Sequence, residues 1–317
     1  MGTPQETAKK IITNISRVLV GKEKVVELAL VTLGCEGHLL LEDVPGVGKT
    51  MLARSLAVSL GLSFNRIQCT PDLLPSDITG IMVFNPKEAD FRFRPGPVLA
   101  HIVLVDEINR ATPRTQAGIL EAMEERQVTV DVNTYPLKRP FFVMATENPV
   151  EFEGTFSLPE AELDRFLLRV SMGYPNQEEE FAILSRMEGE HPIGKIGPVV
   201  DPAEILPFLQ AKNNVFIEES LRRYIVRLVA QTRRHPDLDL GVSPRGTVAL
   251  FNASRALAAI RGREFVIPED IKYLAPFILA HRVMVSAEAS VRGVDGTTVI
   301  QEILASIPVP TEEALDE

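Results

Sequence analysis

The feature of this chain that most constrains its fold is a glycine-rich turn at residues 43–50, DVPGVGKT. The mostly apolar residues 38–41 come directly before the turn and are typical of a short buried strand, and residues 50–60 follow it with apolar residues at helical spacing. Such a turn directs backbone N–H groups and the positive end of the helix dipole toward phosphate groups. The sequence therefore predicts an α/β fold with a phosphate-binding loop.

The residues of this loop have distinct expected roles. The backbone N–H groups of Gly46, Val47 and Gly48 would face nucleotide phosphates. The Lys49 ammonium would reach the β- and γ-phosphates, and the Thr50 hydroxyl would bind Mg²⁺. We therefore predict a binding site for ATP or ADP that is formed by Pro45, Gly46, Val47, Gly48, Lys49, Thr50 and Met51.

One position of the loop departs from the usual pattern. The first glycine of G-x-x-x-x-G-K-[ST] is Asp43 in this chain. Asp tolerates left-handed backbone angles better than most residues, so the loop can still form. The sequence offers no role for this extra carboxylate. The alternative is a turn that is merely rich in glycine, but the Gly-x-Gly-Lys-Thr run after an apolar strand favours phosphate binding.

A second predicted strand ends in two adjacent acids. Residues 102–105 form a continuous apolar run, which is typical of a strand that is covered on both faces, and Asp106 and Glu107 follow it. Ligands of parallel sheets bind at the carboxyl ends of the strands. Asp106 would support Mg²⁺, and Glu107 would act as the base for an attacking water. Acids at a strand end are often only solvated, but the phosphate loop earlier in the chain favours the functional interpretation.

The rest of the chain divides into two parts near Gly173. Before it, strands are predicted at residues 64–67 and 141–145, helices at residues 8–19 and after Gly21, and two β-hairpin inserts. The first hairpin pairs residues 78–84 with 91–98, and the second covers residues 128–137 with its turn at 133–134. After it, helical patterns cover residues 177–187, 203–210, 218–232, 245–260 and 268–283. We predict an α/β domain with a parallel sheet flanked by helices over residues 1–173 and an all-α domain over residues 174–317.

Composition narrows the range of partners. The 317 residues carry a formal net charge of −10, which opposes bulk binding to nucleic acids or anionic membranes. The two cysteines fit a reducing compartment, and no apolar run has the length of a membrane helix or a secretory signal. We expect a cytoplasmic protein that does not insert into a membrane. An arginine cluster in the predicted helical domain leaves DNA binding open, although a solvated or subunit-facing surface is favoured; its members are Arg222, Arg223, Arg227, Arg233 and Arg234.

Five motifs together resemble AAA+ ATPases, and more narrowly the MoxR family. They are LEDVPGVGKT, VLVDEINRA, ATENP, LPEAELDRF and SPR, and the resemblance spans roughly residues 15–285. It implies a P-loop AAA+ core with a helical lid, and a ring, commonly a hexamer, with ATP bound between subunits. It also implies a chaperone-like role in maturing or activating partner proteins, often ones that contain a von Willebrand factor A domain.

The resemblance also implies roles for particular residues. Asn148 matches the sensor 1 position, where a neutral amide can orient water without neutralising the base. Arg165 matches an arginine finger that reaches the next subunit's γ-phosphate, with Arg169 as its nearby competitor. Val20 and Gly21 match the segment that packs against adenine.

Arg245 matches the sensor 2 arginine of the lid, and its local context supports an anionic ligand. Ser243 would cap a helix and Pro244 would occupy its first position, so Arg245 falls in the first turn, where the helix dipole disfavours a cation. Residues 112–114 repeat this arrangement, and Arg114, together with Arg110, is a candidate for a contact across the subunit interface.

Two further expectations concern local structure. Residues 157–160 read as a capping box, which would place Arg165 near the second turn of a helix. The resemblance implies that the two hairpins face a central pore and contact substrate through Phe84, Phe91 and Phe93. The alternative is that these aromatic residues form a small local core.

The favoured function is an ATP-hydrolysing, chaperone-like remodeller of partner proteins. Two alternatives remain open, a DNA-translocating motor and a nucleotide-dependent assembly switch with little turnover. The acidic net charge opposes the motor. The complete set of predicted catalytic residues opposes the switch.

Overall fold

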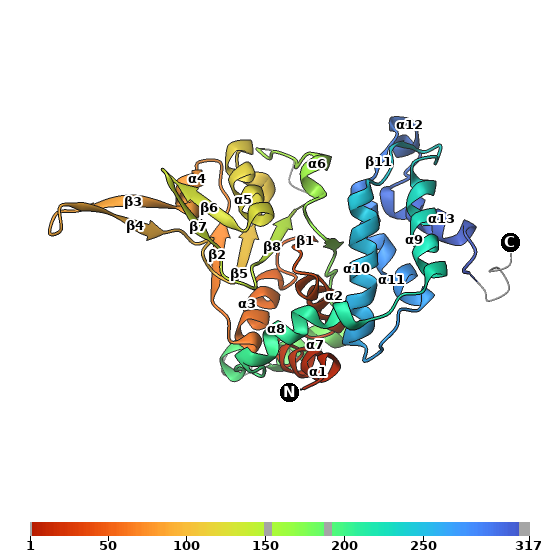
Figure 1. The fold of residues 1–317 in the computed structure, drawn as a ribbon, viewed down its shortest axis with the longest axis horizontal. Helices are drawn as coiled ribbons and strands as arrows, with labels where there is room; N and C mark the ends of the chain where they lie inside the picture. Colours follow the sequence, from red (N-terminus) through yellow and green to blue (C-terminus); the bar gives the residue numbers. More distant parts are fainter. Residues whose placement is uncertain (1, 149–153, 187–191, 311–317) are drawn as a thin grey trace.

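The computed structural model describes residues 2–148, 154–186 and 192–310, and it confirms the predicted fold class (Figure 1). A parallel sheet has the strand order β2-β5-β8-β1-β9. Every neighbouring pair in this sheet is parallel. Its strands are β1 (Leu39–Glu42), β2 (Phe64–Gln68), β5 (Ile102–Asp106), β8 (Phe142–Glu147) and β9 (Leu168–Val170).

Alternation along the strands fills the core on both faces of the sheet. Leu39 and Leu41 of β1 pack into one hydrophobic cluster with α2 (Glu23–Gly34) and α3 (Lys49–Leu60). Leu40 faces the opposite way, into a second cluster with α5 (Pro113–Glu125). Each fully buried aliphatic side chain of this kind contributes about 1.5–3 kcal/mol of hydrophobic stabilisation. Burial of both faces explains the nearly continuous apolar runs of these strands.

The sequence predicts four of the five strands, and β9 is the exception. β9 has three residues, too few for a recognisable pattern, and it pairs with β1 at the edge of the sheet. The strands β1, β5 and β8 are neighbours in the sheet, so the residues that follow them lie at one edge. This edge carries the loop and acids that the sequence singles out.

Both predicted hairpins are present, with shifted boundaries. Ile78 belongs to a short helix, α4 (Pro75–Thr79), and the hairpin that follows consists of β3 (Gly80–Asn85) and β4 (Asp90–Pro95). The second hairpin consists of β6 (Gln127–Val130) and β7 (Asn133–Pro136), so its turn lies at residues 131–132 rather than 133–134. The β3–β4 hairpin projects away from the sheet as a long arm, with β6–β7 beside its base (Figure 1).

Helices and 3₁₀ turns make up the remaining elements before α9. α1 (Pro4–Ile15) begins earlier than predicted because Thr3 and Glu6 form a capping box with Pro4 in the first turn, and it ends at Ile15 rather than at residue 19. α8 (Pro202–Gln210) lies close to α1 and α2, on the side of the molecule near the N-terminus (Figure 1). The other short elements are α6 (Glu160–Leu163), α7 (Gln177–Arg186), η1 (Ile108–Arg110), η2 (Pro192–Lys195) and η3 (Ala211–Asn214).

The lid is helical, as predicted, with one small strand pair that the sequence analysis does not predict. The expected helix over residues 268–283 ends at Leu279, and the chain continues through a 3₁₀ turn into a strand that pairs antiparallel with an earlier one. The predicted boundary between residues 173 and 174 remains a prediction. The elements are α9 (Glu219–Thr232), β10 (Leu238–Leu240), α10 (Pro244–Ile260), α11 (Pro268–Leu279), η4 (Ala280–Arg282), β11 (Met284–Val285), α12 (Ala287–Val291) and α13 (Gly296–Ser306).

Among the described residues, no helix has both the length and the apolar character that crossing a bilayer needs.

Candidate functional site

The glycine-rich loop connects the end of β1 to the start of α3, as predicted. Gly46 and Gly48 have φ angles of +90° and +99°, in the region that residues with a side chain rarely adopt. The Lys49 ammonium donates hydrogen bonds to the carbonyl oxygens of Asp43 (2.5 Å) and Glu147 (3.4 Å). Burial lowers the pKa of Lys49, and the nearby carboxylates of Asp43, Asp106 and Glu107 oppose this effect.

The structure supplies a role for Asp43 that the sequence does not suggest. Its carboxylate oxygen Oδ2 accepts hydrogen bonds from the Ser171 hydroxyl (2.9 Å) and from the backbone N–H groups of Met172 (2.5 Å) and Gly173 (2.8 Å). The Lys22 ammonium donates to the carbonyl oxygens of Met172 (2.9 Å) and Gly173 (3.1 Å). Asp43 therefore fixes the chain that leaves β9 to the start of the phosphate loop.

A cavity of about 330 Å³ brings most of the predicted site residues together. Asn148, the expected sensor 1 residue, is buried and lines this cavity. Arg66 from β2 also lines it, and the sequence analysis does not single it out. The full lining consists of Pro45, Gly46, Gly48, Lys49, Thr50, Met51, Arg66, Asp106, Glu107 and Asn148.

Asp106 and Glu107 are held by side chains of the neighbouring strands. The Asp106 carboxylate accepts a hydrogen bond from the Thr146 hydroxyl (2.7 Å) and pairs with the Arg66 guanidinium (2.6 Å). Glu107 has a φ of +57°, which is uncommon outside glycine, and its N–H donates to the Thr146 hydroxyl (2.8 Å). Its carboxylate accepts from Gln68 (2.8 Å) and Arg110 (3.1 Å).

The donor set at this edge fits Mg²⁺ only in combination with phosphate oxygens. Mg²⁺ prefers oxygen ligands and usually keeps substrate phosphates and waters in its shell. Thr50 supplies a hydroxyl and Asp106 a carboxylate, and within the described ranges no three His, Cys, Asp or Glu residues gather in a way that could hold a metal. The ion would share Asp106 with Arg66.

A second cavity, of about 220 Å³, lies against the other side of the phosphate loop. It shares Gly46, Gly48 and Met51 with the first cavity, and Val20, the expected adenine contact, lines it. Val47 also lines it, whereas Gly21 lines neither cavity. The further lining is mostly apolar, which suits a planar base next to a phosphate site, and includes Val18, Leu19, Lys22, Pro175, Ile183, Arg186 and Pro192.

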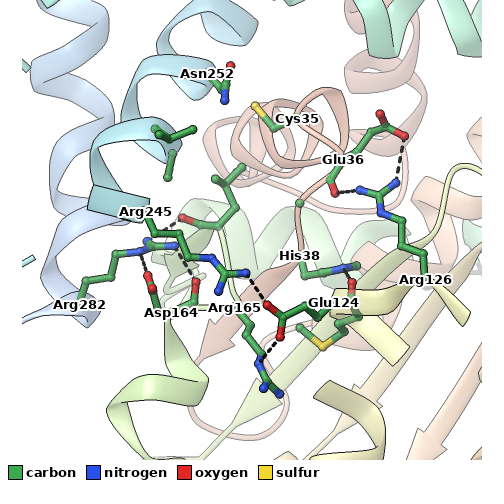
Figure 2. Close-up of a pocket in the computed structure, with 15 residues that line it drawn as sticks. Cys35, Glu36, His38, Glu124, Arg126, Asp164, Arg165, Arg245, Asn252 and Arg282 are labelled. Atoms are coloured by element: carbon green, nitrogen blue, oxygen red, sulfur yellow. Dashed lines mark hydrogen bonds and ion pairs between the residues drawn. The ribbon is translucent and has the colours of Figure 1, made fainter. Parts of the chain in front are cut away.

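Arg165, the expected arginine finger, and Arg245, the expected sensor 2 residue, both line a third cavity of about 280 Å³ (Figure 2). This cavity has no lining residue in common with the phosphate-loop cavity. The Glu124 carboxylate pairs with Arg165 Nε (3.1 Å) through one oxygen and with Arg245 (3.2 Å) through the other. The side chains of Arg165 and Arg245 are 27% and 52% exposed, so both remain accessible from outside.

The local predictions for these arginines have different outcomes. Ser243 caps α10 with Pro244 in the first turn, as predicted, and the anion beside Arg245 in this chain is Glu124. The prediction that Arg165 lies in the second turn of a helix is wrong. α6 has Pro159 at its N-cap and ends at Leu163, because the chain must turn back to enter β9.

Two of the other arginines considered for the subunit interface, Arg169 and Arg110, pair with glutamates of the α/β part of the chain. Arg169 lies in β9 and pairs with Glu42 (3.2 Å), and Arg110 pairs with Glu107. Arg114 is exposed in the first turn of α5, whose N-cap is Thr112 as predicted.

Glu147, at the end of β8, lies beside Glu42 in the sheet. Burial, with a smaller effect of Glu42, raises the pKa of Glu147 to about 7, and Arg169 opposes this shift.

The three phenylalanines of the β3–β4 hairpin differ in exposure and in contacts. Phe84 and Phe91, at 50% and 59% exposure, contact each other edge to face on the β3–β4 arm. Phe93 stacks on Tyr135 of β7, with ring centroids 3.9 Å apart, and so joins the two hairpins. Phe93 forms the local contact, whereas Phe84 and Phe91 stay available to a partner.

Sequence reasoning missed several residues that shape the site, above all Arg66, Glu124 and Arg282. Arg66 lies on β2, and only the strand order reveals that β2 runs beside β5. Glu124 lies at the end of α5, far in sequence from both arginines that it pairs with. No local pattern in the sequence marks either contact.

Comparisons with known proteins agree with this architecture. Residues 38–168 match the ATPase family associated with various cellular activities (AAA), and residues 230–303 match the AAA lid domain. The chain is 51% identical over 305 residues to an uncharacterized protein YeaC of Bacillus subtilis, covering 96% of this chain and 95% of that protein. It is 38% identical over 320 residues to Chaperone MoxR1 of Mycobacterium tuberculosis, covering 98% and 84%. A crystal structure of a candidate ATPase from Cytophaga hutchinsonii superposes with a TM-score of 0.89 at 36% identity, covering 97% and 96%.

Proposed function

We propose that this chain, which belongs to the MoxR family of AAA+ ATPases, hydrolyses ATP in a ring and uses the reaction to remodel partner proteins. One observation carries the proposal. Lys49, Thr50, Asp106, Glu107 and Asn148 line a single cavity at the carboxyl ends of parallel strands. That set combines phosphate binding, support for a magnesium ion and a base, which are the parts that phosphoryl transfer to water needs.

In the proposed reaction, the loop N–H groups and Lys49 bind the β- and γ-phosphates. When bound, Mg²⁺ would neutralise charge on the phosphate oxygens beside Thr50 and Asp106. Glu107 takes a proton from water while the water oxygen bonds to the γ-phosphorus, and the bond to the β-phosphate oxygen breaks to release ADP. Asn148 orients the water. Glu107 first exchanges a contact to Gln68 or Arg110 for this water.

The arginines complete the site of a neighbouring copy in this proposal. Arg165 and Arg245 line a cavity that shares no residue with the phosphate-loop cavity, so we infer that they act on the triphosphate of the adjoining subunit. A cation supplied in this way stabilises charge in the transition state. It also makes hydrolysis depend on assembly, for which a hexameric ring is the expected form.

The proposed partner is a protein, held by the exposed end of the β3–β4 arm. Phe84 and Phe91 offer apolar surface there, and a relative with 38% identity is named a chaperone. A partner with a von Willebrand factor A domain is the specific form of this proposal that the family resemblance suggests.

Two substitutions test the ATPase proposal. We expect Glu107→Gln to retain ATP binding and lose turnover by roughly a hundredfold or more, because the base is removed but the phosphate contacts remain. We expect Lys49→Ala to weaken ATP binding itself. Phosphate release and the affinity for a fluorescent ATP analogue measure the two effects. Steady-state hydrolysis by Glu107→Gln at the parent rate, or unchanged affinity in Lys49→Ala, would contradict the assignments.

The two alternatives give different results in the same assay. A DNA motor requires stimulation of hydrolysis by DNA, and an assembly switch requires ring formation without turnover. Two members of the arginine cluster have partners within the chain, since Arg223 pairs with Glu219 (2.5 Å) and Arg233 donates to the Val242 carbonyl (2.9 Å). The formal net charge of −10 opposes the motor more generally. We therefore expect hydrolysis that DNA does not accelerate.

A further inference from the structure

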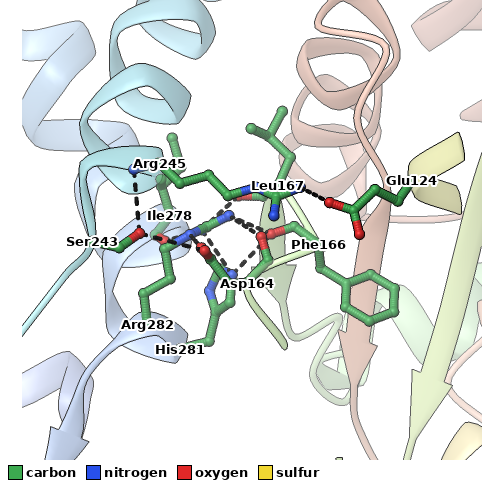
Figure 3. Close-up of polar contacts among 9 residues, drawn as sticks. All are labelled: Glu124, Asp164, Phe166, Leu167, Ser243, Arg245, Ile278, His281 and Arg282. Carbon is green, nitrogen blue, oxygen red and sulfur yellow. Dashed lines mark hydrogen bonds and ion pairs between the residues drawn. The ribbon is translucent and has the colours of Figure 1, made fainter. Parts of the chain in front are cut away.

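Arg282 of the lid is the most highly coordinated side chain near the two arginines (Figure 3). It lies in η4, at the end of α11, and only 3% of its side chain is exposed. Its guanidinium pairs with the Asp164 carboxylate (2.5 Å). It also donates to four backbone carbonyl oxygens, those of Asp164 (3.2 Å), Phe166 (2.6 Å), Leu167 (3.2 Å) and Ile278.

These acceptors surround Arg165 in the sequence. Residues 164–167 form the turn between α6, which ends at Leu163, and β9, which begins at Leu168. The turn carries Arg165, and three of its four carbonyl groups accept hydrogen bonds from Arg282. A lid residue therefore holds the backbone on both sides of an arginine that belongs to the α/β domain.

The same turn also contacts the start of α10. The Ser243 hydroxyl, which caps α10, donates to the second oxygen of the Asp164 carboxylate (3.4 Å) and accepts from the N–H of Arg245 (3.2 Å). Glu124 then bridges the ends of Arg165 and Arg245. The backbone that carries the two arginines is thus held by one ion pair, between the buried Arg282 and the partly buried Asp164.

We propose that Arg282 is a positioning residue for ATP hydrolysis at the neighbouring subunit. Through Asp164 it fixes the turn that presents Arg165, so that the orientation of the lid determines where both arginines meet the adjoining triphosphate. This inference rests on the proposed function, in which Arg165 acts in trans. A planar guanidinium suits this position because its five donors have a fixed geometry, which an ammonium group cannot reproduce.

The first test is Arg282→Lys, which keeps the charge but loses the fork of donors. We expect kcat to fall about 10- to 100-fold, because small displacements of a catalytic group have effects of that size. The affinity of the subunit's own site for ATP is expected to stay within about twofold, since that cavity shares no residue with the arginine cavity. Asp164→Asn, which keeps the side-chain size, should change kcat in the same direction.

A matched control separates positioning from lid stability. Arg263 in the lid pairs with the fully buried Asp270 (2.6 Å) and donates to none of residues 164–167 in the part of the chain that the structure describes. Arg263→Lys therefore weakens a comparable lid ion pair without touching the turn. We expect it to lower thermal stability and to leave kcat within about twofold.

Mixed assemblies test the trans action directly. Subunits with Arg282→Lys retain Glu107, and subunits with Glu107→Gln retain properly held arginines. In an equal mixture, roughly a quarter of the interfaces combine an ATP site that has Glu107 with a neighbour that has Arg282. Hydrolysis by the mixture should therefore exceed that of either variant alone. A mixture of Arg165→Ala with Glu107→Gln serves as the reference and should recover to a similar extent.

The outcomes separate the role of Arg282 from the trans action of Arg165. The role of Arg282 is overturned if Arg282→Lys alone keeps the parent kcat, or if its mixture stays inactive while the Arg165→Ala mixture recovers. If Arg165→Ala also fails to recover, the trans arrangement in the proposed function is wrong, and the role of Arg282 is wrong with it. If Arg282→Lys does not fold, the same mixtures with Asp164→Asn decide the question.

Discussion

At the scale of single residues, Asp43 supports the candidate site from the start of the phosphate loop. Lys49, Thr50, Asp106, Glu107 and Asn148 line one cavity because each lies at or after the end of a strand at the same edge of the sheet. The Asp43 carboxylate joins this loop to residues 171–173, which follow β9 and which no local pattern in the sequence connects to the loop.

The role of Asp43 predicts a measurable loss of stability. Asp43→Ala would leave buried N–H groups at Met172 and Gly173 without their acceptor, which typically costs about 1–3 kcal/mol. Urea denaturation of the nucleotide-free protein measures this change. Asp43→Asn, which keeps an acceptor oxygen, is the matched control and should lose less. Equal stability of Asp43→Ala and the parent would show that these hydrogen bonds contribute nothing.

Glu147 predicts a pH dependence of the free energy of unfolding. Burial raises its pKa in the folded state to about 7, above the usual 4.5, so the folded state binds the proton more tightly than the unfolded state. This contribution to stability is present at low pH and is lost as the pH rises through about 7. Glu147→Gln removes the titration and should be more stable than the parent at pH 8 by up to about 3 kcal/mol, but not at pH 4.5.

Denaturation curves of the two nucleotide-free proteins at both pH values test this expectation. The comparison between variant and parent cancels other titrating groups, such as His38, whose pKa burial lowers to about 4. A difference in stability that is the same at both pH values would contradict the raised pKa of Glu147.

At the scale of elements, long periodic segments are predictable and short ones are not. α3, α9 and α10 follow from their apolar spacing, and α10 also begins with its own cap at Ser243. β9 and α6, with three and four residues, depend on contacts with β1 and with the lid, so the sequence gives no signal for β9 and misplaces Arg165. The position of Arg165, the proposed trans-acting arginine, is thus set by tertiary contacts.

The two hairpins give a prediction at this scale. Phe93→Ala removes the ring stack on Tyr135 that joins β4 to β7, and such a pair contributes about 0.5–1.5 kcal/mol. We expect amide hydrogen exchange to become roughly 2- to 10-fold faster in both hairpins. Phe84→Ala is the control, because its edge-to-face partner Phe91 lies on the same arm, and it should leave β6–β7 unchanged. Unaltered exchange in β6–β7 of Phe93→Ala would show that the stack does not couple the hairpins.

At the scale of the whole molecule, the proposed sites for binding and for completing hydrolysis are separate. The two cavities beside the phosphate loop hold all the residues proposed to bind ATP except Gly21, and Arg165 and Arg245 line a third cavity. A single copy would therefore bind the nucleotide but lack the cations that stabilise the transition state. The sequence predicts both sets of residues, but it cannot show that they line separate cavities, because this depends on how the lid packs against the sheet.

The most direct test of this account is the rate of ATP hydrolysis per chain, measured over a wide range of protein concentration with ATP binding followed in parallel. We predict that turnover per chain falls by at least about tenfold on dilution below the concentration of assembly, because Arg165 of a neighbour is then lost. ATP binding per chain should stay constant over the same range. Full turnover in dilute, monomeric protein would contradict the claim that neighbouring copies complete the active site.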